Sequence, residues 1–190
     1  MSNEHVRYDL GGAALTRSML DDICRIYDLV FSAKPFFWRD DESELHRERL
    51  LSLLDDPTYG IVTASQDDQL IGFGYGFTIS AQTKRWTQVV PSPAPDVAAE
   101  WEGRTFLLFD YAVLPGHRGV GVGRQVHDRL LGSRTEERAT LTVQPTAVDT
   151  KAIYEHWGWR KIGQIEGGPT AAAPVFDVYL RESLADLRQS

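Results

Sequence analysis

Two different periods of apolar residues run along the chain, and they predict helices in some stretches and strands in others. The i, i+3, i+4, i+7 spacing of a helix with one buried face is formed by Ile23, Ile26, Tyr27 and Val30. Ser18 precedes this stretch as a candidate N-cap, with Asp21 three residues later, and the helix should end before Pro35. A second helix is predicted over 43–54, with three leucines turned inward: Leu50, Leu53 and Leu54.

Short runs rich in β-branched and aromatic residues predict strands at 6–10, 59–65, 70–80, 105–113, 139–143, 159–166 and 174–180. Two more helices are expected, one from the glycines at 119–123 to about residue 131 and one over 149–157. The early strands follow one another through hairpins, whereas the later strands alternate with helices. This order predicts a mixed α/β sheet.

The strand at 70–80 has one bare face. Its glycines and aromatic residues alternate in the order Gly72, Phe73, Gly74, Tyr75, Gly76 and Phe77. Because glycine carries no side chain, this face is open to close approach by another element or by a ligand.

The segment 81–104 has no sustained strand pattern and contains three prolines and two tryptophans, Trp86 and Trp101. A loop of this length is usually functional or disordered. The two tryptophans favour a packed loop.

Composition narrows the class of protein. The 190 residues are 42% apolar, which suits one domain over 1–190, and the single cysteine, Cys24, excludes an internal disulfide. No apolar run approaches the roughly 20 residues that cross a bilayer, and the N-terminus lacks a signal-peptide pattern. A net charge of −7 disfavours nucleic-acid binding. We therefore expect a cytoplasmic protein with no membrane, nucleic-acid or metal partner.

Positive charge gathers at one place in this acidic chain. Between residues 115 and 134 lie one acid, Asp128, and four arginines: Arg118, Arg124, Arg129 and Arg134. The same stretch holds Gly119, Gly121 and Gly123 between a predicted strand and a predicted helix. Free N–H groups and the positive end of a helix dipole bind phosphate. A polyanionic small ligand would explain the charge, and a solvated helix face, above all at Arg129 and Arg134, is the alternative.

Two common phosphate loops do not fit. A P-loop requires GxxxxGK[ST], and no lysine lies between residues 85 and 150. A dinucleotide fingerprint that begins at Gly121 would need a third glycine at position 126, which is valine.

The loop instead reads RxxGxG, from Arg118 to Gly123. It resembles the acetyl-CoA pyrophosphate loop of the GNAT N-acetyltransferase superfamily. A second block, AVDTKAIYEHWGW at 147–159, resembles the helix pattern NxxAxxxYxxxGF of that family, with Ala147 and Thr150 as departures. The order of elements also matches over most of the chain. The resemblance implies a mostly antiparallel mixed sheet of about seven strands, flanked by helices, with two splayed central strands.

The resemblance also implies how acetyl-CoA, the co-substrate, would bind. Its amide-rich arm would pair with strand backbone at Ala112, Val113 and Leu114, beside the strand at 139–143. Its pyrophosphate would meet the backbone N–H groups and charges of the loop: Arg118, Gly119, Val120, Gly121, Val122, Gly123 and Arg124. The alternative is that the glycines only make a turn.

Transfer of an acetyl group to an amine needs a neutral amine and a proton for the departing thiolate. By its motif position, Tyr154 is expected to be the acid; the alternative is a core aromatic residue. Asp110, in an apolar strand, is a candidate base, a substrate anchor or a structural residue. A bulge is frequent in this strand of the superfamily, so alternation alone leaves open which face Asp110 occupies. The three histidines at 117, 127 and 156 are expected at the surface.

The acceptor pocket would lie among the first two helices, their connection and the loop at 81–104. Its candidate residues are Phe37, Trp38, Asp40, Tyr75 and Trp86, with Phe36, Asp41 and Glu42 beside them. Packing of the helix connection is the alternative role for these aromatic residues. We expect acetyl transfer to a primary amine of a small molecule, of metabolite, polyamine or aminoglycoside type. The alternatives are a protein lysine or N-terminal amine and, less favoured because Tyr154 is present, a non-catalytic CoA-binding module. A homodimer is common in the family.

Overall fold

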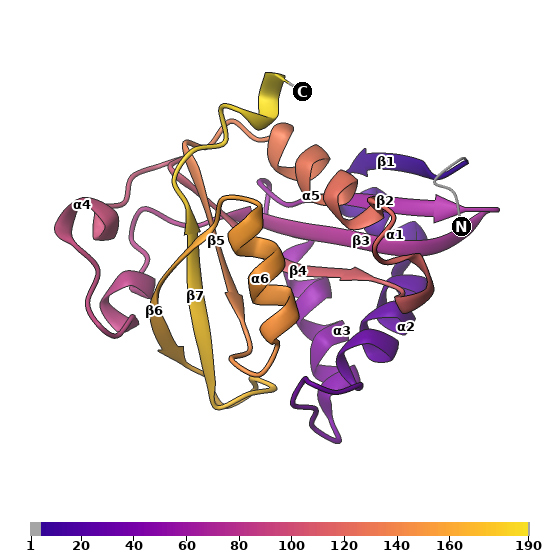
Figure 1. Ribbon diagram of the computed structural model, residues 1–190, viewed down its shortest axis with the longest axis horizontal. Helices are drawn as coiled ribbons and strands as arrows, with labels where there is room; N and C mark the ends of the chain where they lie inside the picture. The colour runs from indigo at the N-terminus through magenta and orange to yellow at the C-terminus, as the bar shows by residue number, and fades with distance from the viewer. Residues whose placement is uncertain (1–4, 190) are drawn as a thin grey trace.

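One seven-stranded sheet, in the order β1-β2-β3-β4-β5-β7-β6, organises the chain (Figure 1). The computed structural model describes residues 5–189. The strands are β1 (Arg7–Gly11), β2 (Gly60–Gln66), β3 (Gln69–Thr78), β4 (Thr105–Val113), β5 (Arg138–Val143), β6 (Arg160–Glu166) and β7 (Val175–Arg181). All neighbouring strands pair antiparallel except β4 and β5. The mostly antiparallel mixed sheet predicted from the sequence is confirmed.

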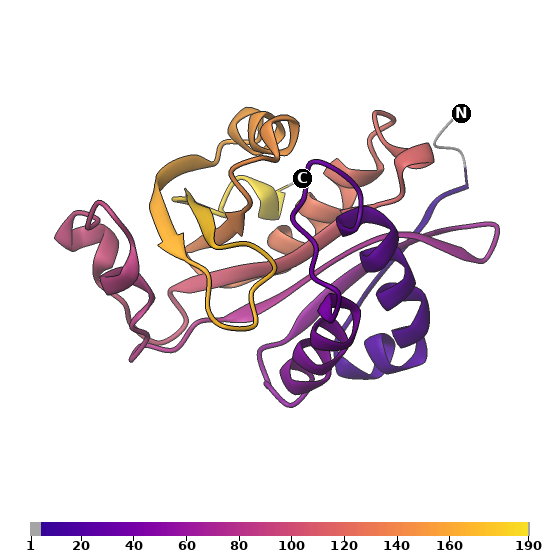
Figure 2. The ribbon, with the colours of Figure 1, turned by 90° about the horizontal axis from the view of Figure 1, so that it is seen from below.

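Helices cover both faces of the sheet. The α-helices are α1 (Ala13–Ser18), α2 (Leu20–Phe31), α3 (Glu42–Leu53), α4 (Pro95–Ala98), α5 (Val122–Gly132) and α6 (Val148–His156). Short 3-10 turns are η1 (Arg85–Gln88), η2 (Pro115–His117) and η3 (Leu187–Gln189). In Figure 2 the orange helices α5 and α6 lie above the sheet, and the indigo and purple helices α1 to α3 lie below it. None of the helices within residues 5–189 is long and apolar enough to cross a membrane.

The start of the first long helix differs from the prediction. Ser18 ends the short helix α1, and its hydroxyl donates to the Leu15 carbonyl at 2.7 Å. Met19 is the N-cap of α2 and makes no side-chain cap. A six-residue helix is too short for a periodic apolar pattern to reveal it. The buried face predicted for α2 is confirmed at Ile23, Ile26, Tyr27 and Val30.

The bare face of β3 receives neighbouring elements. A Cβ atom on Gly74 would lie 3.2 Å from Val126 Cγ1 of α5. A Cβ atom on Gly76 would lie 2.0 Å from the Leu107 carbonyl oxygen. The glycines therefore let α5 and β4 approach β3 more closely than side chains would allow.

The central strands splay, as the resemblance implies. β4 and β5 pair only over Thr105–Leu107 and Arg138–Thr140. Both strands continue beyond these residues, β4 to Val113 and β5 to Val143, without pairing to each other. The unpaired ends of the two strands therefore leave a gap in the sheet.

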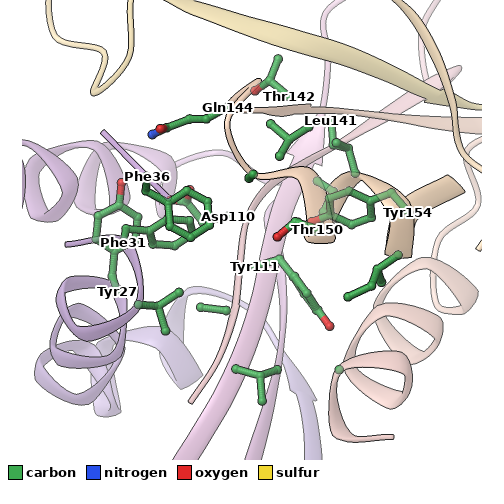
Figure 3. Close-up of a pocket in the computed structure, with 18 of the residues that line it drawn as sticks. Tyr27, Phe31, Phe36, Asp110, Tyr111, Leu141, Thr142, Gln144, Thr150 and Tyr154 are labelled. Carbon is green, nitrogen blue, oxygen red and sulfur yellow. The ribbon is translucent and has the colours of Figure 1, made fainter. Parts of the chain in front are cut away.

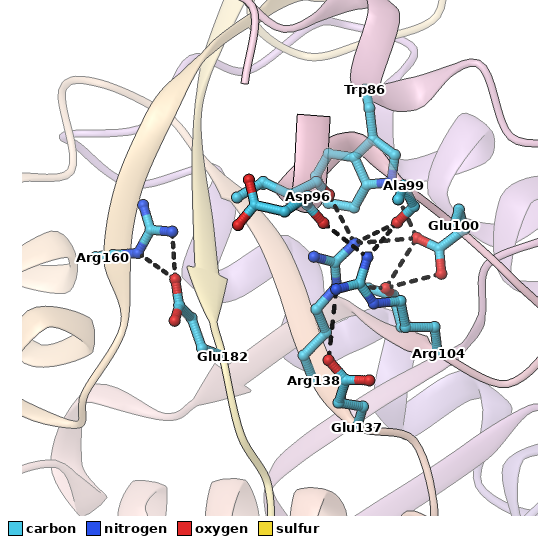
Figure 4. A network of polar contacts seen from close by, with 11 residues as sticks. Trp86, Asp96, Ala99, Glu100, Arg104, Glu137, Arg138, Arg160 and Glu182 are labelled. Carbon is cyan, nitrogen blue, oxygen red and sulfur yellow. Dashed lines mark hydrogen bonds and ion pairs between the residues drawn. The ribbon is translucent and has the colours of Figure 1, made fainter. Parts of the chain in front are cut away.

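The segment 81–104 is a packed loop, held by a polar network at one end of the sheet (Figure 4). The Trp86 indole N–H donates to Glu100 at 2.9 Å, and Arg138 Nη2 donates to the Val97 carbonyl at 2.9 Å. The Arg104 guanidinium lies 4.0 Å from the centre of the Trp101 ring. These contacts give the loop a fixed frame.

Candidate active site

A cavity of about 1090 Å³ follows the gap between β4 and β5. It runs from the glycine loop to the connection between α2 and α3. Figure 3 shows Phe31, Phe36 and Asp110 on one side of the cavity and Leu141 and Tyr154 on the other. One continuous space therefore joins the expected cofactor end to the expected acceptor end.

A bulge in β4 decides where Asp110 lies. Tyr75 pairs with Asp110 but the next residue of β3, Gly76, pairs with Leu108, so Phe109 is the extra residue. Simple alternation would place Asp110 on the same face as Leu108, which packs with α5. The extra residue moves Asp110 to the opposite face, beside Tyr75 and under α2 and α3.

Asp110 ends a buried chain of hydrogen bonds. The Tyr75 hydroxyl donates to the Asp110 carboxylate, and its oxygen lies 3.1 Å from His46 Nε2. Because the hydroxyl has a single proton, His46 must carry its proton on Nε2. Burial, followed by the nearby Arg49, lowers the pKa of His46 to about 3. The ring is therefore neutral at pH 7, and its 3.7 Å separation from Asp110 is not an ion pair.

The Asp110 carboxyl is suited to accept a proton near neutral pH. Burial raises its pKa to about 6, against the opposing effects of the Tyr75 hydrogen bond and of Arg49, while Glu42 raises it further. The side chain is 16% exposed and lines the cavity. It is therefore both desolvated and within reach of a molecule in the cavity.

A second polar group lies on α3 at the same end of the cavity. The fully buried Glu42 accepts hydrogen bonds from the Tyr27 hydroxyl at 2.9 Å and from Arg49. Arg49 also donates to the Thr170 carbonyl at 3.3 Å. Glu42 and His46 are four residues apart, and Arg49 follows at a helical spacing, so one face of α3 presents all three toward the sheet.

Tyr154 lines the cavity from α6, as its motif position implies. Its ring packs against Tyr111, Trp157, Trp159 and Tyr179. Among the described residues, none hydrogen-bonds its hydroxyl. Burial, followed by the charge of Asp110, raises the pKa of Tyr154 above its ordinary value of 10. The phenol is therefore protonated at neutral pH and free to donate.

The glycine loop has the backbone of an anion site. Gly121 is the N-cap of α5 and has a φ of 91°, a left-handed conformation that favours glycine. Arg118 Nε donates to the Val113 carbonyl at 2.9 Å, and Arg124 pairs with Asp128. Both arginines line the cavity, so positive charge and the α5 N-terminus face the same space.

Two residues of β4 turn backbone groups toward the gap, although the Val113 carbonyl already accepts from Arg118. The Leu114 N–H donates to the Ile71 carbonyl at 2.9 Å, so Leu114 faces β3. Alternate residues of an antiparallel strand face opposite sides, which turns the N–H and carbonyl of Val113 and Tyr111 toward β5. Within the predicted stretch 112–114, Val113 is thus the residue whose backbone faces the cleft.

Of two groups predicted at the surface, His127 is buried and Arg134 is half-buried. His127 is fully buried in α5, with Nδ1 2.7 Å from Asp128 Oδ1 and with Nε2 accepting from the Trp159 indole at 2.9 Å. Helical spacing gave no sign of this, because one partner, Asp128, is polar and the other, Trp159, lies in a distant turn after α6. The Arg134 side chain is 17% exposed and pairs with Glu136 at 2.7 Å. Both residues serve packing around α5.

The structure brings only part of the predicted acceptor group together. Tyr75 does not line the cavity but donates a hydrogen bond to Asp110, which does. Trp86 packs with Val89 and Leu107 outside the cavity. Phe37, Trp38 and Asp40 also lie outside the cavity lining. Their place is taken by residues that sequence reasoning did not select: Tyr27, Phe31, Arg49 and Arg85. Phe36 and Glu42, which were predicted beside the acceptor pocket, line the cavity.

Among the described residues, no group of three or more His, Cys, Asp or Glu side chains could hold a metal ion.

Comparisons with known family models and solved structures agree on one family. The model of the acetyltransferase (GNAT) family matches residues 23–159. No curated protein matches the sequence. Among solved structures, a GNAT-family protein from Desulfovibrio desulfuricans has a TM-score of 0.64 at 18% identity and covers 95% of this chain and 99% of its own.

Two further structures carry informative descriptions. The ribosomal-protein-S18-alanine N-acetyltransferase of Escherichia coli has a TM-score of 0.59 at 16% identity, covering 92% of this chain and 91% of its own. A GNAT acetyltransferase from Elizabethkingia anophelis, solved with acetyl-CoA bound, has a TM-score of 0.56 at 12% identity, covering 95% and 99%. At these identities the likeness shows a shared fold.

Proposed function

The chain belongs to the acetyltransferase (GNAT) family and is an acyltransferase, and from that premise we propose that it transfers an acetyl group from acetyl-CoA to a primary amine of a small molecule. The observation that carries the proposal is the single cavity that joins a glycine loop at the N-terminus of α5 to a desolvated carboxylate, Asp110. We propose further that residues 1–190 act as one acetyltransferase domain.

The cofactor end would be held mainly by backbone. Residues 119–124 lie just before and within the first turn of α5, where unpaired N–H groups and the helix dipole favour a pyrophosphate, and Arg118 and Arg124 add charge. The arm would pair with the Val113 N–H and with the backbone groups of Tyr111 in the gap beside β5, because the Val113 carbonyl is engaged by Arg118. This arrangement explains why the departures at Ala147 and Thr150, both in the cavity wall, are tolerated.

Asp110 and Tyr154 supply the two proton transfers. As the nitrogen lone pair forms the new bond to the acetyl carbon, the amine proton passes to Asp110. As the carbon–sulfur bond breaks, the Tyr154 phenol donates its proton to the sulfur. Tyr75 and His46 position the Asp110 carboxylate, because their hydrogen bonds fix its orientation on the buried side.

The acceptor end is covered, which favours a small acceptor. Arg39 Nη1 donates to the Pro169 carbonyl at 2.8 Å, and Arg49 donates to Thr170 in the same loop between β6 and β7. The Phe37 N–H donates to Gln144 Oε1 at 2.6 Å, which ties the α2–α3 connection to the end of β5. A protein segment would have to displace these contacts.

Transfer to a protein lysine or to an N-terminal amine is the alternative. The observation in its favour is that the structural neighbours include ribosomal-protein-alanine N-acetyltransferases, which share the fold. Tyr154, placed in the cavity wall, disfavours a non-catalytic CoA-binding module.

A screen of amines separates these possibilities. Free thiol released from acetyl-CoA is measured with alkylamines, diamines, amino acids, aminoglycosides and peptides that begin with alanine or contain lysine. We expect the highest kcat/KM among the small amines. A higher value for a peptide would support the alternative, and thiol release no faster than hydrolysis for every amine would reject acetyl transfer to amines.

A further inference from the structure

Arg85 is a cation without an acceptor in the wall of the cavity. Its Nε and Nη2 atoms are buried and have no hydrogen-bond partner. Within residues 5–189 no acceptor contacts any part of its guanidinium. A buried donor that is left unpaired is unfavourable, and a charged one more so. Something outside the described chain is therefore needed to satisfy it.

The other arginines of the cavity wall are already engaged. Arg49 pairs with Glu42, Arg118 donates to the Val113 carbonyl, and Arg124 pairs with Asp128. Arg85 differs because only burial acts on it: burial lowers its pKa to about 10, and no carboxylate offsets this effect. It nevertheless remains protonated at neutral pH. Its charge is thus available to an anion in the cavity.

Arg85 is also held on a fixed frame. It begins the turn η1, and its neighbour Trp86 is locked by the hydrogen bond to Glu100 and by the Arg138 guanidinium, 5.1 Å from the ring centre. The Arg85 guanidinium itself lies 6.0 Å from the centre of the Trp86 ring. These contacts fix the turn from which the Arg85 side chain extends, and a planar guanidinium can bind an oxyanion with two parallel hydrogen bonds.

We propose that the acetyl acceptor carries an oxyanion, a carboxylate or a phosphate-like group, in addition to its amine, and that Arg85 binds this group. The inference rests on the proposed function and deepens it. Asp110 faces the amine, and Arg85 faces the anionic end of the same molecule in the same cavity. Polyamines and aminoglycosides become poor candidates, because they would bring further positive charge against an unpaired cation.

The test is calorimetry on the CoA-loaded protein with matched probes. A short series of ω-amino carboxylates is compared with alkylamines of equal length and with the corresponding aminoalkylphosphonates. At the best length, the carboxylate or the phosphonate should bind at least about tenfold more tightly than the alkylamine, the factor expected of a charged hydrogen bond. The better of the two anions identifies the acceptor class.

Three variants assign the effect to Arg85. Arg85→Gln should reduce the preference to nearly one, and Arg85→Lys should restore part of it. The control is Lys84→Gln, which removes the same charge from the exposed neighbouring position and should leave the preference unchanged. Thermal melting checks the fold, which Arg85→Gln should retain because it removes an unpaired buried charge.

Two results would overturn the inference. One is the absence of any oxyanion-dependent binding in the wild-type protein at every chain length. The other is a preference that survives in folded Arg85→Gln. Acetyl transfer is measured in parallel: alkylamines acetylated without any anion preference would reject the role of Arg85 and leave the proposed function standing. Anion-dependent binding without acetyl transfer to any amine would support the role of Arg85 in binding and reject the proposed function.

Discussion

Replacing Asp110 by asparagine should make the protein more stable and less active at neutral pH. The carboxyl is removed from water on the α2–α3 side of β4, and its ordinary pKa of 3.8 rises to about 6. Asparagine has nearly the same shape, and its Oδ1 atom can still accept the hydrogen bond from Tyr75. The substitution therefore removes an unfavourable buried charge with little change in packing.

The magnitude follows from linkage. Between pH 3.8 and about 6 the folded protein binds more protons than the unfolded chain, so its stability falls as the pH rises through this window. Each pH unit corresponds to about 1.4 kcal/mol, so ionised Asp110 destabilises the fold at pH 7 by up to about 3 kcal/mol. Some of this is offset by a weaker Tyr75 hydrogen bond. We expect a net gain of roughly 1–2 kcal/mol, or a rise in Tm of about 3–6 °C.

Thermal unfolding and steady-state kinetics on the same samples provide the assay. The gain in Tm should be largest near pH 7.5 and should shrink as the pH approaches 4, where the wild-type carboxyl is protonated. If Asp110 is the base, kcat should fall and the acidic limb of the wild-type kcat/KM profile, near pH 6, should disappear. If it is an anchor, KM should rise and kcat should change little.

Asp177, a carboxylate whose pKa is shifted in the opposite direction, supplies the control. Burial raises the pKa of Asp177, but hydrogen bonds from Lys161, Gln164 and Lys151 outweigh this effect and lower it. Asp177→Asn should therefore destabilise the protein at pH 7, and the difference should shrink as the pH falls through the lowered pKa. If Asp110→Asn is also destabilised and keeps the wild-type pH profile, Asp110 is a structural partner of Tyr75 and the reasoning fails.

Two further predictions concern Tyr154 and Gly121. Tyr154→Phe should lower kcat at least roughly tenfold, because a general acid contributes ~10²–10⁴-fold, with little change in acetyl-CoA affinity; Tyr179→Phe, which loses a hydroxyl bonded to Glu155 in the same cluster, should change stability more than turnover. Wild-type kcat in Tyr154→Phe, measured where chemistry limits the rate, would reduce this tyrosine to packing. Gly121→Asp should weaken acetyl-CoA binding by several kcal/mol in calorimetry, because it sets a negative charge against the pyrophosphate. Gly121→Ala imposes the left-handed backbone strain alone, so equal losses in both variants would contradict the electrostatic explanation.

Much of the fold could be read from the sequence because local patterns determine it. The strand at Thr105–Val113 was predicted to the residue, and other strands and long helices to within about two residues, since apolar periodicity and turn residues act over short distances. The helix α1 was not predicted, because six residues complete fewer than two turns and so do not repeat an apolar pattern. The splay of β4 from β5 has no local signal and was available only through the family resemblance.

The two ends of the proposed site also differ in how far local sequence determines them. The proposed cofactor loop is a contiguous segment whose glycines form a recognisable motif, so the sequence alone reveals it. The acceptor end is assembled from α2, α3, η1 and the bulge of β4. Polar residues at helical spacing on α3, Glu42 and His46, were a signal, but a pattern search that treats polar residues as outward-facing discards it. Trp86 was chosen where its neighbour Arg85 reaches the cavity, because sequence does not state which of two adjacent side chains turns inward.

This division matches what each end must recognise. Backbone N–H groups at the α5 N-terminus suit a pyrophosphate that is common to every acetyl-CoA enzyme of the family, and they depend little on side chains. The proposed acceptor end instead combines Asp110, whose carboxyl pKa burial raises to about 6, with Arg85, whose guanidinium stays charged at neutral pH. Because one group changes its charge near neutral pH and the other does not, proton removal and anion binding respond separately to pH. If the proposed roles hold, substitutions in η1 and α3 should change which amine is preferred, whereas substitutions at Asp110 and Tyr154 should lower the rate with every amine.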